Sequence, residues 1–260
     1  MTLWVMLLEL NHTYLDINKR TNNEILQYLL CYPKYDNNLF KLRLHELKQL
    51  GIQRLELVGP TLLNGNAILG KGTRGIVIKA HSKNFYCALK IRRLDSPRIN
   101  LLNEVKIQSY VNSFGVGPKI INYSDNFIMM ELINGKVLSD FYLMPSINTE
   151  IIRCMIKSLL NQCYKLDLYG VDHGELSDLR KHVIINQRVN IIDFDSSSTN
   201  RKTSNLTSSV QYLFIGGPHS KTFQTLFDID IDDVILLLRQ YKLNKNYLNF
   251  SHLLNLLNMN

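Results

Sequence analysis

The stretch Leu69–Val77, which reads Leu-Gly-Lys-Gly-Thr-Arg-Gly-Ile-Val, constrains the fold more than any other part of the sequence. Gly70, Gly72 and Gly75 have G-x-G-x-x-G spacing, and glycine lets a backbone bend tightly and bring N–H groups close to phosphate oxygens. In dinucleotide-binding folds the same spacing opens a helix. Here Ile76–Ala80 is rich in β-branched residues and should continue as a strand. The sequence predicts a glycine hairpin over phosphates, with a purely structural turn as the alternative.

Strand-like segments come first along the chain and helical patterns follow. Strands are expected at 54–58, 67–69, 76–80, 86–91, 120–123 and 127–132. Helices are expected through 1–50 and at 97–112, 148–168 and 232–239, with a hairpin at 183–192. This order predicts an α+β fold with two lobes and a cleft between them. The expected domains are a helical extension (1–58), a strand-rich lobe (59–132) and a helical lobe (133–260).

Several helix boundaries follow from local residue preferences. Gly51 is expected to end the helix before it as a C-cap, and Asn148 to begin a helix as its N-cap. Ser96 followed by Pro97 has the pattern of an N-cap and a first helical residue, so it predicts a helix start at about residue 97.

Charge and cysteine content restrict the partners and the compartment. The net charge is +8, and residues 71–119 contain ten basic residues against two acidic ones. This predicts a polyanionic partner, either nucleotide phosphates or RNA, with a solvated surface as the alternative. No apolar run approaches the roughly 20 residues of a membrane helix, and no signal peptide is expected. The four cysteines form no CxxC pair, so we expect reduced thiols, a cytoplasmic location and no membrane association.

Lys90 ends the strand-like run Cys-Ala-Leu-Lys, where its ammonium group would point into the cleft. A buried cation needs a partner, and Glu104 on the helix that follows is the candidate. Leu101, Val105 and Ile107 would pack that helix on the sheet. The alternative is that Lys90 extends to solvent and Glu104 lies on an exposed helix face.

Two further segments could contact a nucleotide and its metal. The backbone of Met130–Leu132 could hydrogen-bond an adenine edge, although any buried strand has similar residues. In the second half, Glu175 follows His-Gly, His182 precedes an apolar triplet, and Asp193 ends a two-Ile run. A carboxylate, a second polar anchor and a further Asp are what a phosphoryl-transfer centre needs.

These motifs occur in protein-kinase order over about residues 66–200: the glycine loop, Cys-Ala-Leu-Lys, Glu104, Met-Glu-Leu, His-Gly-Glu-Leu and Asp-Phe-Asp. The chain resembles the small archaeal proteins classed as predicted serine/threonine kinases, relatives of the Rio kinases and of the kinase subunit of the KEOPS tRNA-modifying complex. Phrases similar to His-Gly-Glu-Leu…Lys-His-Val-Ile and to Asn205–Phe214 characterise that group. The resemblance implies a protein-kinase-like bilobal fold with an antiparallel-sheet N-lobe containing one key helix, a reduced helical C-lobe and a helical N-terminal extension.

The resemblance also implies roles for individual residues. Glu175, Lys90 and Asp193 would be catalytic, and Asp193 would bind Mg²⁺ that bridges the phosphates of ATP. The implied nucleotide site consists of Gly70, Lys71, Gly72, Gly75, Val77, Ala88, Lys90, Glu104, Met130, Glu131 and Leu132. His182 occupies the place of the usual second metal ligand, Asn, with Arg180 and Asp178 as alternatives. An imidazole suits a transition metal better than Mg²⁺, so Mn²⁺ use would be a consequence.

The leading functional hypothesis is an ATP- and metal-dependent atypical serine/threonine protein kinase that acts on itself or on a partner protein. No Ala-Pro-Glu segment follows Asp193, so the peptide-docking platform of ordinary kinases is in doubt. The hydroxyls of Ser196–Ser204 could be acceptors, although a solvated polar loop explains them too. Two alternatives stay open. One is an ATPase serving a tRNA- or ribosome-linked assembly, with RNA or ribonucleoprotein as its partner, and the other is a nucleotide-binding pseudokinase scaffold.

Overall fold

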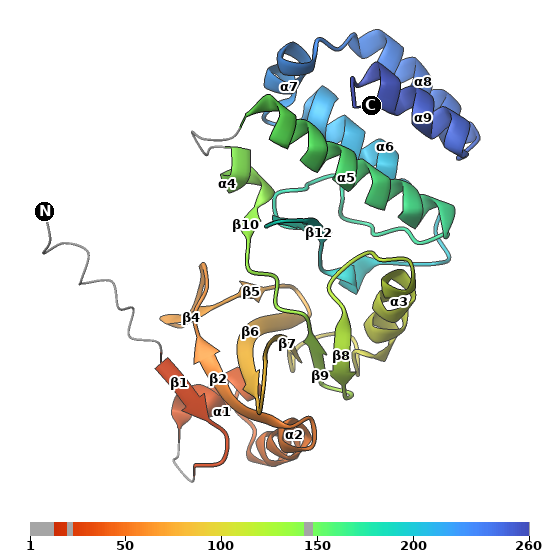
Figure 1. The fold of residues 1–260 in the computed structure, drawn as a ribbon. Helices are drawn as coiled ribbons and strands as arrows, with labels where there is room; N and C mark the ends of the chain where they lie inside the picture. Colours follow the sequence, from red (N-terminus) through yellow and green to blue (C-terminus); the bar gives the residue numbers. More distant parts are fainter. Residues whose placement is uncertain (1–12, 20–22, 143–147, 260) are drawn as a thin grey trace, which may run out of the picture. The chain divides into compact units, whose positions relative to one another are not determined.

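The computed structural model describes residues 13–19, 23–142 and 148–259 of the chain. They form a mixed α+β fold with an antiparallel sheet and several helices, in two compact units (Figure 1). The first unit contains the described residues up to Val105 together with Lys119–Leu132. The second contains Lys106–Pro118 together with the described residues from Ile133 onward.

The first unit is built on an antiparallel sheet. Within the described residues seven strands belong to it, and six follow one another in the order β1-β2-β6-β7-β9-β8 while β5 pairs with β6. Their bounds are β1 Thr13–Asp16, β2 Ile52–Leu57, β5 Gly70–Lys71, β6 Gly75–Ser82, β7 Tyr86–Arg92, β8 Ile120–Tyr123 and β9 Phe127–Met130. A separate hairpin consists of β3 (Thr61–Leu63) and β4 (Asn66–Ile68). All the expected strands are therefore present, although β9 ends two residues before the expected position.

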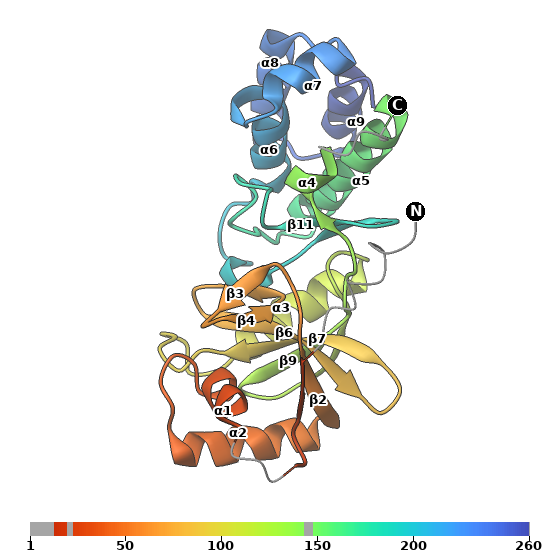
Figure 2. The same cartoon turned by 90° about the vertical axis from the view of Figure 1, so that its left-hand side faces the viewer.

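Two helices, α1 (Glu24–Leu30) and α2 (Asn37–Gln49), cover one face of this sheet (Figure 2). Each begins at a capping residue: the side chain of Asn23 accepts the N–H groups of Ile25 and Leu26, and that of Asp36 accepts the N–H of Leu39. Leucines of both helices and the inward-facing residues of the strands form one apolar core. The cost of ordering the helices is thus offset by burial against the sheet.

A buried arginine ties these helices to the β8–β9 turn. Arg43 on α2 is 1 % exposed; its Nη1 donates to the carbonyl of Leu30 and its Nη2 to Oδ1 of Asn126. Asn126 in turn donates to Glu46, 2.7 Å away. Burial lowers the pKa of Arg43 to about 10, so the side chain is still charged at neutral pH. A buried charge that has hydrogen-bond partners holds the elements it joins in one arrangement.

The expectation that residues 1–50 are helical throughout is wrong in part. Thr13–Asp16 forms strand β1, which pairs with β2 in the register Leu15↔Leu55. Leu15 is 2 % exposed and the residues on either side of it are not buried, so the segment has the alternation of a half-buried strand. The part of the expectation that concerns residues 1–12 lies outside the described residues.

The helix that carries Glu104, α3 (Leu102–Ser113), begins five residues later than expected. The side chain of Asn100, and not that of Ser96, accepts the N–H of Leu102. Leu101 and Val105 pack with Ile128 in the first unit, as expected, whereas Ile107 belongs to the apolar core of the second unit. A local capping preference therefore did not decide where the helix starts, because the packing of Leu101 did.

The second unit is mainly helical. Its helices are α4 Leu138–Tyr142, α5 Thr149–Leu168, α6 Asn205–Val210, α7 Ser220–Phe227, α8 Ile231–Leu243 and α9 Tyr247–Leu256. A small antiparallel sheet has the order β10-β11-β12, with bounds Lys136–Val137, Val183–Ile185 and Val189–Ile191. Asn148 caps α5 through the N–H of Ile151, as the sequence predicts.

A buried carboxylate organises the helices of this unit. Asp167 on α5 accepts the backbone N–H groups of Asn205 and Leu206 at the start of α6, and also the hydroxyl of Tyr241 on α8. Burial raises the pKa of Asp167, while these hydrogen bonds favour its charged form. Asn205 extends the network, because its amide donates to the carbonyl of Val171 and accepts the N–H of His173.

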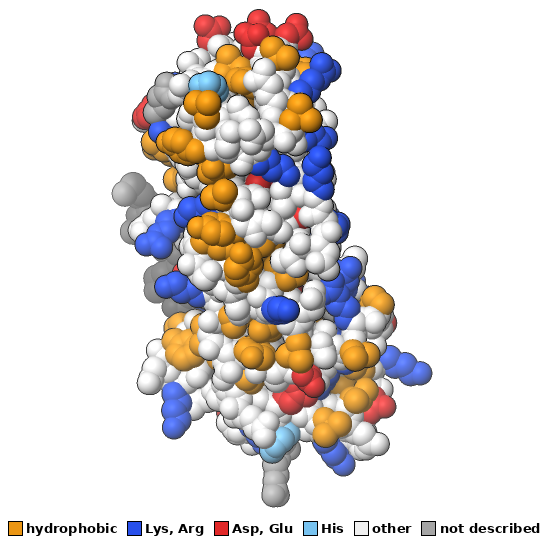
Figure 3. All heavy atoms as spheres, turned by 90° about the vertical axis from the view of Figure 1, so that its right-hand side faces the viewer, with side chains coloured by type: hydrophobic (Ala, Val, Ile, Leu, Met, Phe, Trp, Pro, Cys, Tyr) orange, Lys and Arg blue, Asp and Glu red, His pale blue; other side chains and the backbone are white. Residues whose placement is uncertain are grey.

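One face of the molecule shows how the charged side chains are distributed (Figure 3). In the face shown in Figure 3, basic side chains are scattered and acidic side chains gather at one end of the second unit. At the junction of α7 and α8 the exposed acids are Asp228, Asp230, Asp232 and Asp233. None of the helices in the described ranges combines the length and the apolar character that crossing a bilayer requires.

We expect α2 to be an integral part of the first unit. Replacing Leu47, which is fully buried, by Ala should lower the free energy of unfolding by about 2–5 kcal/mol, because it removes core contacts and leaves a cavity. The matched control is Leu42→Ala on the same helix, where the side chain is 61 % exposed and the change should stay within about 0.5 kcal/mol. Urea unfolding measures both, and equal effects would contradict an integral α2.

Candidate functional site

The glycine motif forms a β-hairpin, as its β-branched continuation predicts. Gly70 lies opposite Val77, and Lys71 lies opposite Ile76. The N–H of Gly72 donates to the carbonyl of Gly75 at 2.8 Å, which closes the turn and leaves that N–H unavailable to a phosphate.

The tip of the hairpin is held by Arg93, whose Nη1 donates to the carbonyl of Gly72 at 3.0 Å while its Nε donates to Asp95. Gly75 lies against the side chain of Lys90: a Cβ at this position would come within 3.0 Å of Lys90 Cε and 3.2 Å of Cγ. The glycine therefore makes room for the lysine, which is a packing reason for this residue in the motif.

Lys90 and Glu104 form the expected ion pair. Lys90 is 4 % exposed and Glu104 is 1 % exposed, and Nζ lies 2.7 Å from Oε1. The alternative, a lysine extending to solvent, is wrong for this structure. Two buried charges with a short hydrogen bond hold each other in place, and removing either leaves an uncompensated charge.

Three of the other residues expected at a nucleotide lie on the same face of the sheet as Lys90. Val77 lies opposite Lys90, Ala88 is two residues away on the same strand, and Met130 lies opposite Ala88. Lys71 does not join them, because its partner in the register, Ile76, is a core residue on the other face. Its ammonium group lies 5.2 Å from the centre of the Tyr32 ring.

The segment expected to contact an adenine edge is partly engaged elsewhere. The N–H of Glu131 donates to the carbonyl of Lys119 at 2.9 Å. The exposed carboxylate of Glu131 accepts the N–H of Lys119. Leu132 follows the end of β9 and is not part of a strand.

In the second unit, strand pairing brings His182 next to Asp193. Val183 lies opposite Ile191 in the β11–β12 hairpin, and the N–H of Ile192 donates to the carbonyl of His182 at 2.9 Å. Asp193, the next residue, has φ +66° and ψ +77°, the left-handed conformation that Asp adopts more readily than most residues. The conformation turns the chain sharply at the end of the strand.

Glu175 completes a cluster of three ligand-type side chains with His182 and Asp193. One ligand atom from each lies within 4.8 Å of the others, and His182 Nε2 is 3.9 Å from Glu175 Oε2. His182 Nδ1 is buried and has no hydrogen-bond partner among the residues that the structure describes. Two carboxylates and an imidazole form a donor set that suits a divalent ion, and the imidazole favours a transition metal over Mg²⁺. The residues therefore fit a metal ion.

The structure favours His182 over the other two residues considered for this position. Arg180 donates to both oxygens of Asp178, through Nε at 2.9 Å and Nη2 at 2.7 Å. The hydrogen bonds from Arg180 lower the pKa of Asp178 to about 2. These two side chains neutralise one another at the surface, and neither is in the three-residue cluster.

His173, the residue before Gly174 and Glu175, is fully buried beside the cluster. Its Nε2 lies 3.0 Å from the carbonyl of Ile192, so this nitrogen carries the proton. The ring contacts those of His182 and Phe194, with centroids 5.4 Å and 5.1 Å away. Burial, and then the neighbouring His182, lowers the pKa of His173 to about 4, so it is neutral near pH 7. The neutral ring of His173 therefore packs against His182 and Phe194 and helps to hold the cluster in position.

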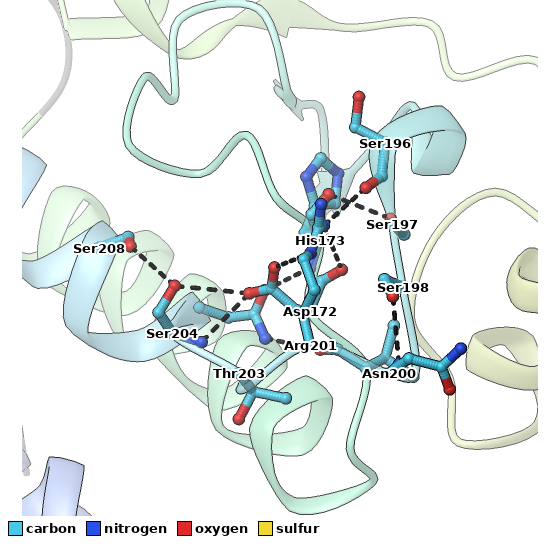
Figure 4. A network of polar contacts seen from close by, with 12 residues as sticks. Asp172, His173, Ser196, Ser197, Ser198, Asn200, Arg201, Thr203, Ser204 and Ser208 are labelled. Atoms are coloured by element: carbon cyan, nitrogen blue, oxygen red, sulfur yellow. Dashed lines mark hydrogen bonds and ion pairs between the residues drawn. The ribbon is translucent and has the colours of Figure 1, made fainter.

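A polar network that the sequence pattern does not predict holds the Glu175 loop (Figure 4). Asp172 and Ser198 exchange two backbone hydrogen bonds of 2.9 Å, and Ser197 Oγ donates to the carbonyl of His173. Arg201 forms an ion pair with Asp172, with Nε 2.9 Å from Oδ2. The first part of the hydroxyl-rich segment 196–204 is thus bound to the protein and is not simply solvated. In the sequence, the presence of Arg201 within a run of Ser and Thr is the feature that could have indicated this network.

The basic stretch between residues 71 and 119 is not one continuous cationic surface. Lys79 pairs with the buried Glu56, Lys90 with Glu104 and Arg93 with Asp95. These pairs remove part of the charge on which the expectation of an RNA partner rested, and that expectation stays a prediction.

We expect the protein without nucleotide to bind Mn²⁺ more tightly than Mg²⁺. The variant His182→Asn exchanges the imidazole for an amide, so Mn²⁺ affinity should fall about 10- to 100-fold and the preference for Mn²⁺ over Mg²⁺ should shrink. Calorimetric titration with each metal measures this. His252→Asn, at an exposed position on α9, is the control. Unchanged Mn²⁺ binding by His182→Asn would exclude His182 as a ligand.

The buried His173 makes stability depend on pH. Its pKa is about 4 in the folded protein against 6.5 for an ordinary histidine, so the unfolded chain takes up the proton first as pH falls. The contribution of neutral His173 to the free energy of unfolding is complete above pH 6.5. It is lost as the pH falls from 6.5 towards 4, and the total loss is on the order of 3 kcal/mol at most. His173→Gln should flatten the curve of unfolding free energy against pH in this window, and His252→Gln should leave it unchanged. Parallel curves for His173→Gln and the parent would contradict the assignment.

Comparison with known proteins adds one relative. No family model matches the chain. It is 30% identical over 105 residues to the uncharacterized protein MJ1211 of Methanocaldococcus jannaschii, a match that covers 40% of this chain and 89% of the relative. The chain therefore belongs to the same family as this archaeal protein.

Proposed function

We propose that the chain is an ATP- and divalent-metal-dependent phosphotransferase with a protein-kinase-like bilobal fold, of the atypical serine/threonine kinase type. The observation that carries the proposal is the cluster of Glu175, His182 and Asp193, with ligand atoms within 4.8 Å of one another. These are the three residues that the resemblance to kinases assigns to the reaction centre. Glu175 comes from a loop, and His182 and Asp193 come from the two chain segments at the open end of the β11–β12 hairpin.

The first unit supplies a second line of support. An antiparallel sheet carries a glycine hairpin, and the lysine beneath it is held by a glutamate on a helix. An ammonium group that Glu104 holds in a fixed position is a cationic ligand that suits phosphate oxygens. The role proposed for Lys90 is to hold the phosphates of ATP, and the role of Glu104 is to orient Lys90.

Within the second unit the proposal divides the cluster by chemistry. Asp193 and His182 would hold the metal, which when bound supplies positive charge to the phosphate oxygens. Glu175, whose side chain is more exposed than that of His182, would orient the acceptor hydroxyl and accept its proton. His173 stays neutral near pH 7, with its Nε2 proton donated to the carbonyl of Ile192, and would only maintain the arrangement.

The test is turnover of γ-labelled ATP with Mn²⁺ or Mg²⁺. We expect metal-dependent transfer or release of the label, and a loss of about 100-fold or more in both Lys90→Ala and Asp193→Asn, because each removes a charge that contacts the phosphates. Lys83→Ala, at an exposed position in the β6–β7 turn, is the matched control.

Absence of turnover with both metals, or full activity in the two variants, would contradict the proposal. Release of inorganic phosphate without labelling of any acceptor would instead indicate an ATPase. Binding of ATP without either outcome would indicate a nucleotide-binding scaffold.

A further inference from the structure

Arg93 joins the glycine hairpin to the helical layer of the first unit. It directly follows β7, and its backbone N–H donates to the carbonyl of Arg74 at 2.9 Å. The next N–H along the chain, that of Leu94, donates to the carbonyl of Tyr32 at 2.8 Å. Tyr32 lies just beyond the end of α1, so the backbone at residues 93–94 is hydrogen-bonded both to the hairpin and to the segment that leaves α1.

The side chain of Arg93 makes a second connection between the same two parts. Nη1 donates to the carbonyl of Gly72 at 3.0 Å, and Cζ lies 5.0 Å from the centre of the Tyr32 ring. A guanidinium group at this distance from an aromatic face is attracted to it. Tyr32 is 8 % exposed, and its ring makes an edge contact with that of Tyr28 on α1, with centroids 5.5 Å apart. The guanidinium group therefore contacts the hairpin and the helical layer at the same time.

Asp95 fixes the orientation of this guanidinium group. Nε and Nη2 of Arg93 donate to the two carboxylate oxygens of Asp95, at 2.8 Å and 2.6 Å. Such a two-point pair sets the plane of the guanidinium group as well as its position, and it leaves Nη1 for the carbonyl of Gly72. The pair alone would stabilise only the local turn, whereas the bond from Nη1 reaches 21 residues back along the chain.

The hairpin contributes a further contact to Tyr32. The ammonium group of Lys71 lies 5.2 Å from the centre of the same ring. Two successive residues of the hairpin are thus held, Lys71 through its side chain and Gly72 through its carbonyl. Glycine loses more conformational freedom on ordering than any other residue, so a hairpin with glycines at positions 70, 72 and 75 needs such contacts to keep one conformation.

The arrangement favours an effect of Arg93 on position over an effect of its charge. Asp95 compensates the charge of Arg93, so the pair adds little net attraction for an anion. A loop that is ordered before its ligand arrives binds that ligand more tightly than a mobile loop, because the cost of ordering is met on folding. The contribution of Arg93 to a phosphate ligand would therefore come through the hairpin.

We propose that Arg93 is a positioning residue, which clamps the glycine hairpin against Tyr32 before ATP binds and thereby raises the affinity for the nucleotide. The segment that follows α1 then takes part in nucleotide binding without touching the ligand. The inference rests on the proposed function for the identity of the ligand, whereas the clamp is a property of the chain alone.

The clamp is tested without nucleotide, by hydrogen–deuterium exchange on the full chain. Arg93→Ala removes the side-chain contacts, and Asp95→Asn removes the carboxylate that orients the guanidinium group. In both variants the amides of residues 70–76 should exchange about fivefold faster or more, because the hairpin opens more often. The matched controls are Arg239→Ala, at an exposed position on α8, and Glu24→Gln, at an exposed position on α1.

Exchange in the other strands of the first unit should stay at the parent's rate, which shows that each variant is folded. Hairpin exchange at the parent's rate in both variants would refute the clamp.

Calorimetric titration with ATP and Mn²⁺ separates a role in positioning from a role of charge. Asp95→Asn removes a negative charge, so attraction alone predicts tighter ATP binding, whereas loss of the clamp predicts an affinity about threefold weaker. Arg93→Ala should weaken binding about fivefold to tenfold. Arg93→Lys keeps the charge but lacks the planar fork that pairs with Asp95, so it should not restore the affinity. Undiminished ATP binding by Asp95→Asn, or full restoration by Arg93→Lys, would overturn the inference.

Turnover of γ-labelled ATP completes the test. Arg93→Ala and Asp95→Asn should raise KM for ATP by similar factors and change kcat less than about twofold, because the hairpin affects nucleotide binding and not the chemical step. A parent that turns over ATP, together with variants of unchanged KM, would refute the role of Arg93 and keep the proposed function. A parent that binds no ATP would refute the phosphotransferase, and with it the role of the clamp in nucleotide binding.

Discussion

The candidate centre depends on the pairing of His182 with Ile192 at the open end of the β11–β12 hairpin. Because a strand register is fixed by which side chains are buried, the burial of Val183 and Ile191 decides which residues stand at the hairpin's mouth. A shift by one residue would move His182 away from Asp193. Asp193 has a left-handed conformation that costs roughly 1–2 kcal/mol in a residue other than glycine. The apolar hairpin and the buried ring of Phe194 stabilise that conformation.

In both units, buried polar groups surrounded by apolar residues hold the residues of the candidate site in place. In the first unit Lys90 and Glu104 form a short ion pair, and in the second Asp167 and Asn205 hold the backbone that leads to His173. Such groups contribute little net stability over apolar ones, because their desolvation offsets the attraction between them. Their effect is on arrangement, since a wrong packing would leave a buried charge or donor without a partner.

Features that depend on neighbouring residues in the sequence were predictable, and those that depend on distant ones were not. The hairpin at the glycine motif and the start of α5 at Asn148 follow from local preferences. The start of α3 and the presence of strand β1 do not follow from local preferences. The packing of Leu101 and the pairing of Leu15 with Leu55 override those preferences. The side of the hairpin on which Lys71 lies, with its ammonium group over Tyr32, also depends on a residue far away in the sequence.

The sequence by itself determined which residue types are available and their order: a glycine hairpin, a lysine on a strand, a glutamate on a helix, then Glu175, His182 and Asp193. These features are local, so spacing and β-propensity are enough to recognise them. Only the tertiary structure decided that His182, rather than Arg180 or Asp178, joins the two carboxylates, and that Arg201 forms an ion pair with Asp172. Both depend on the hairpin register and on the burial of Asp172. Burial is a property of the packed chain, and a single sequence does not specify it for a polar residue.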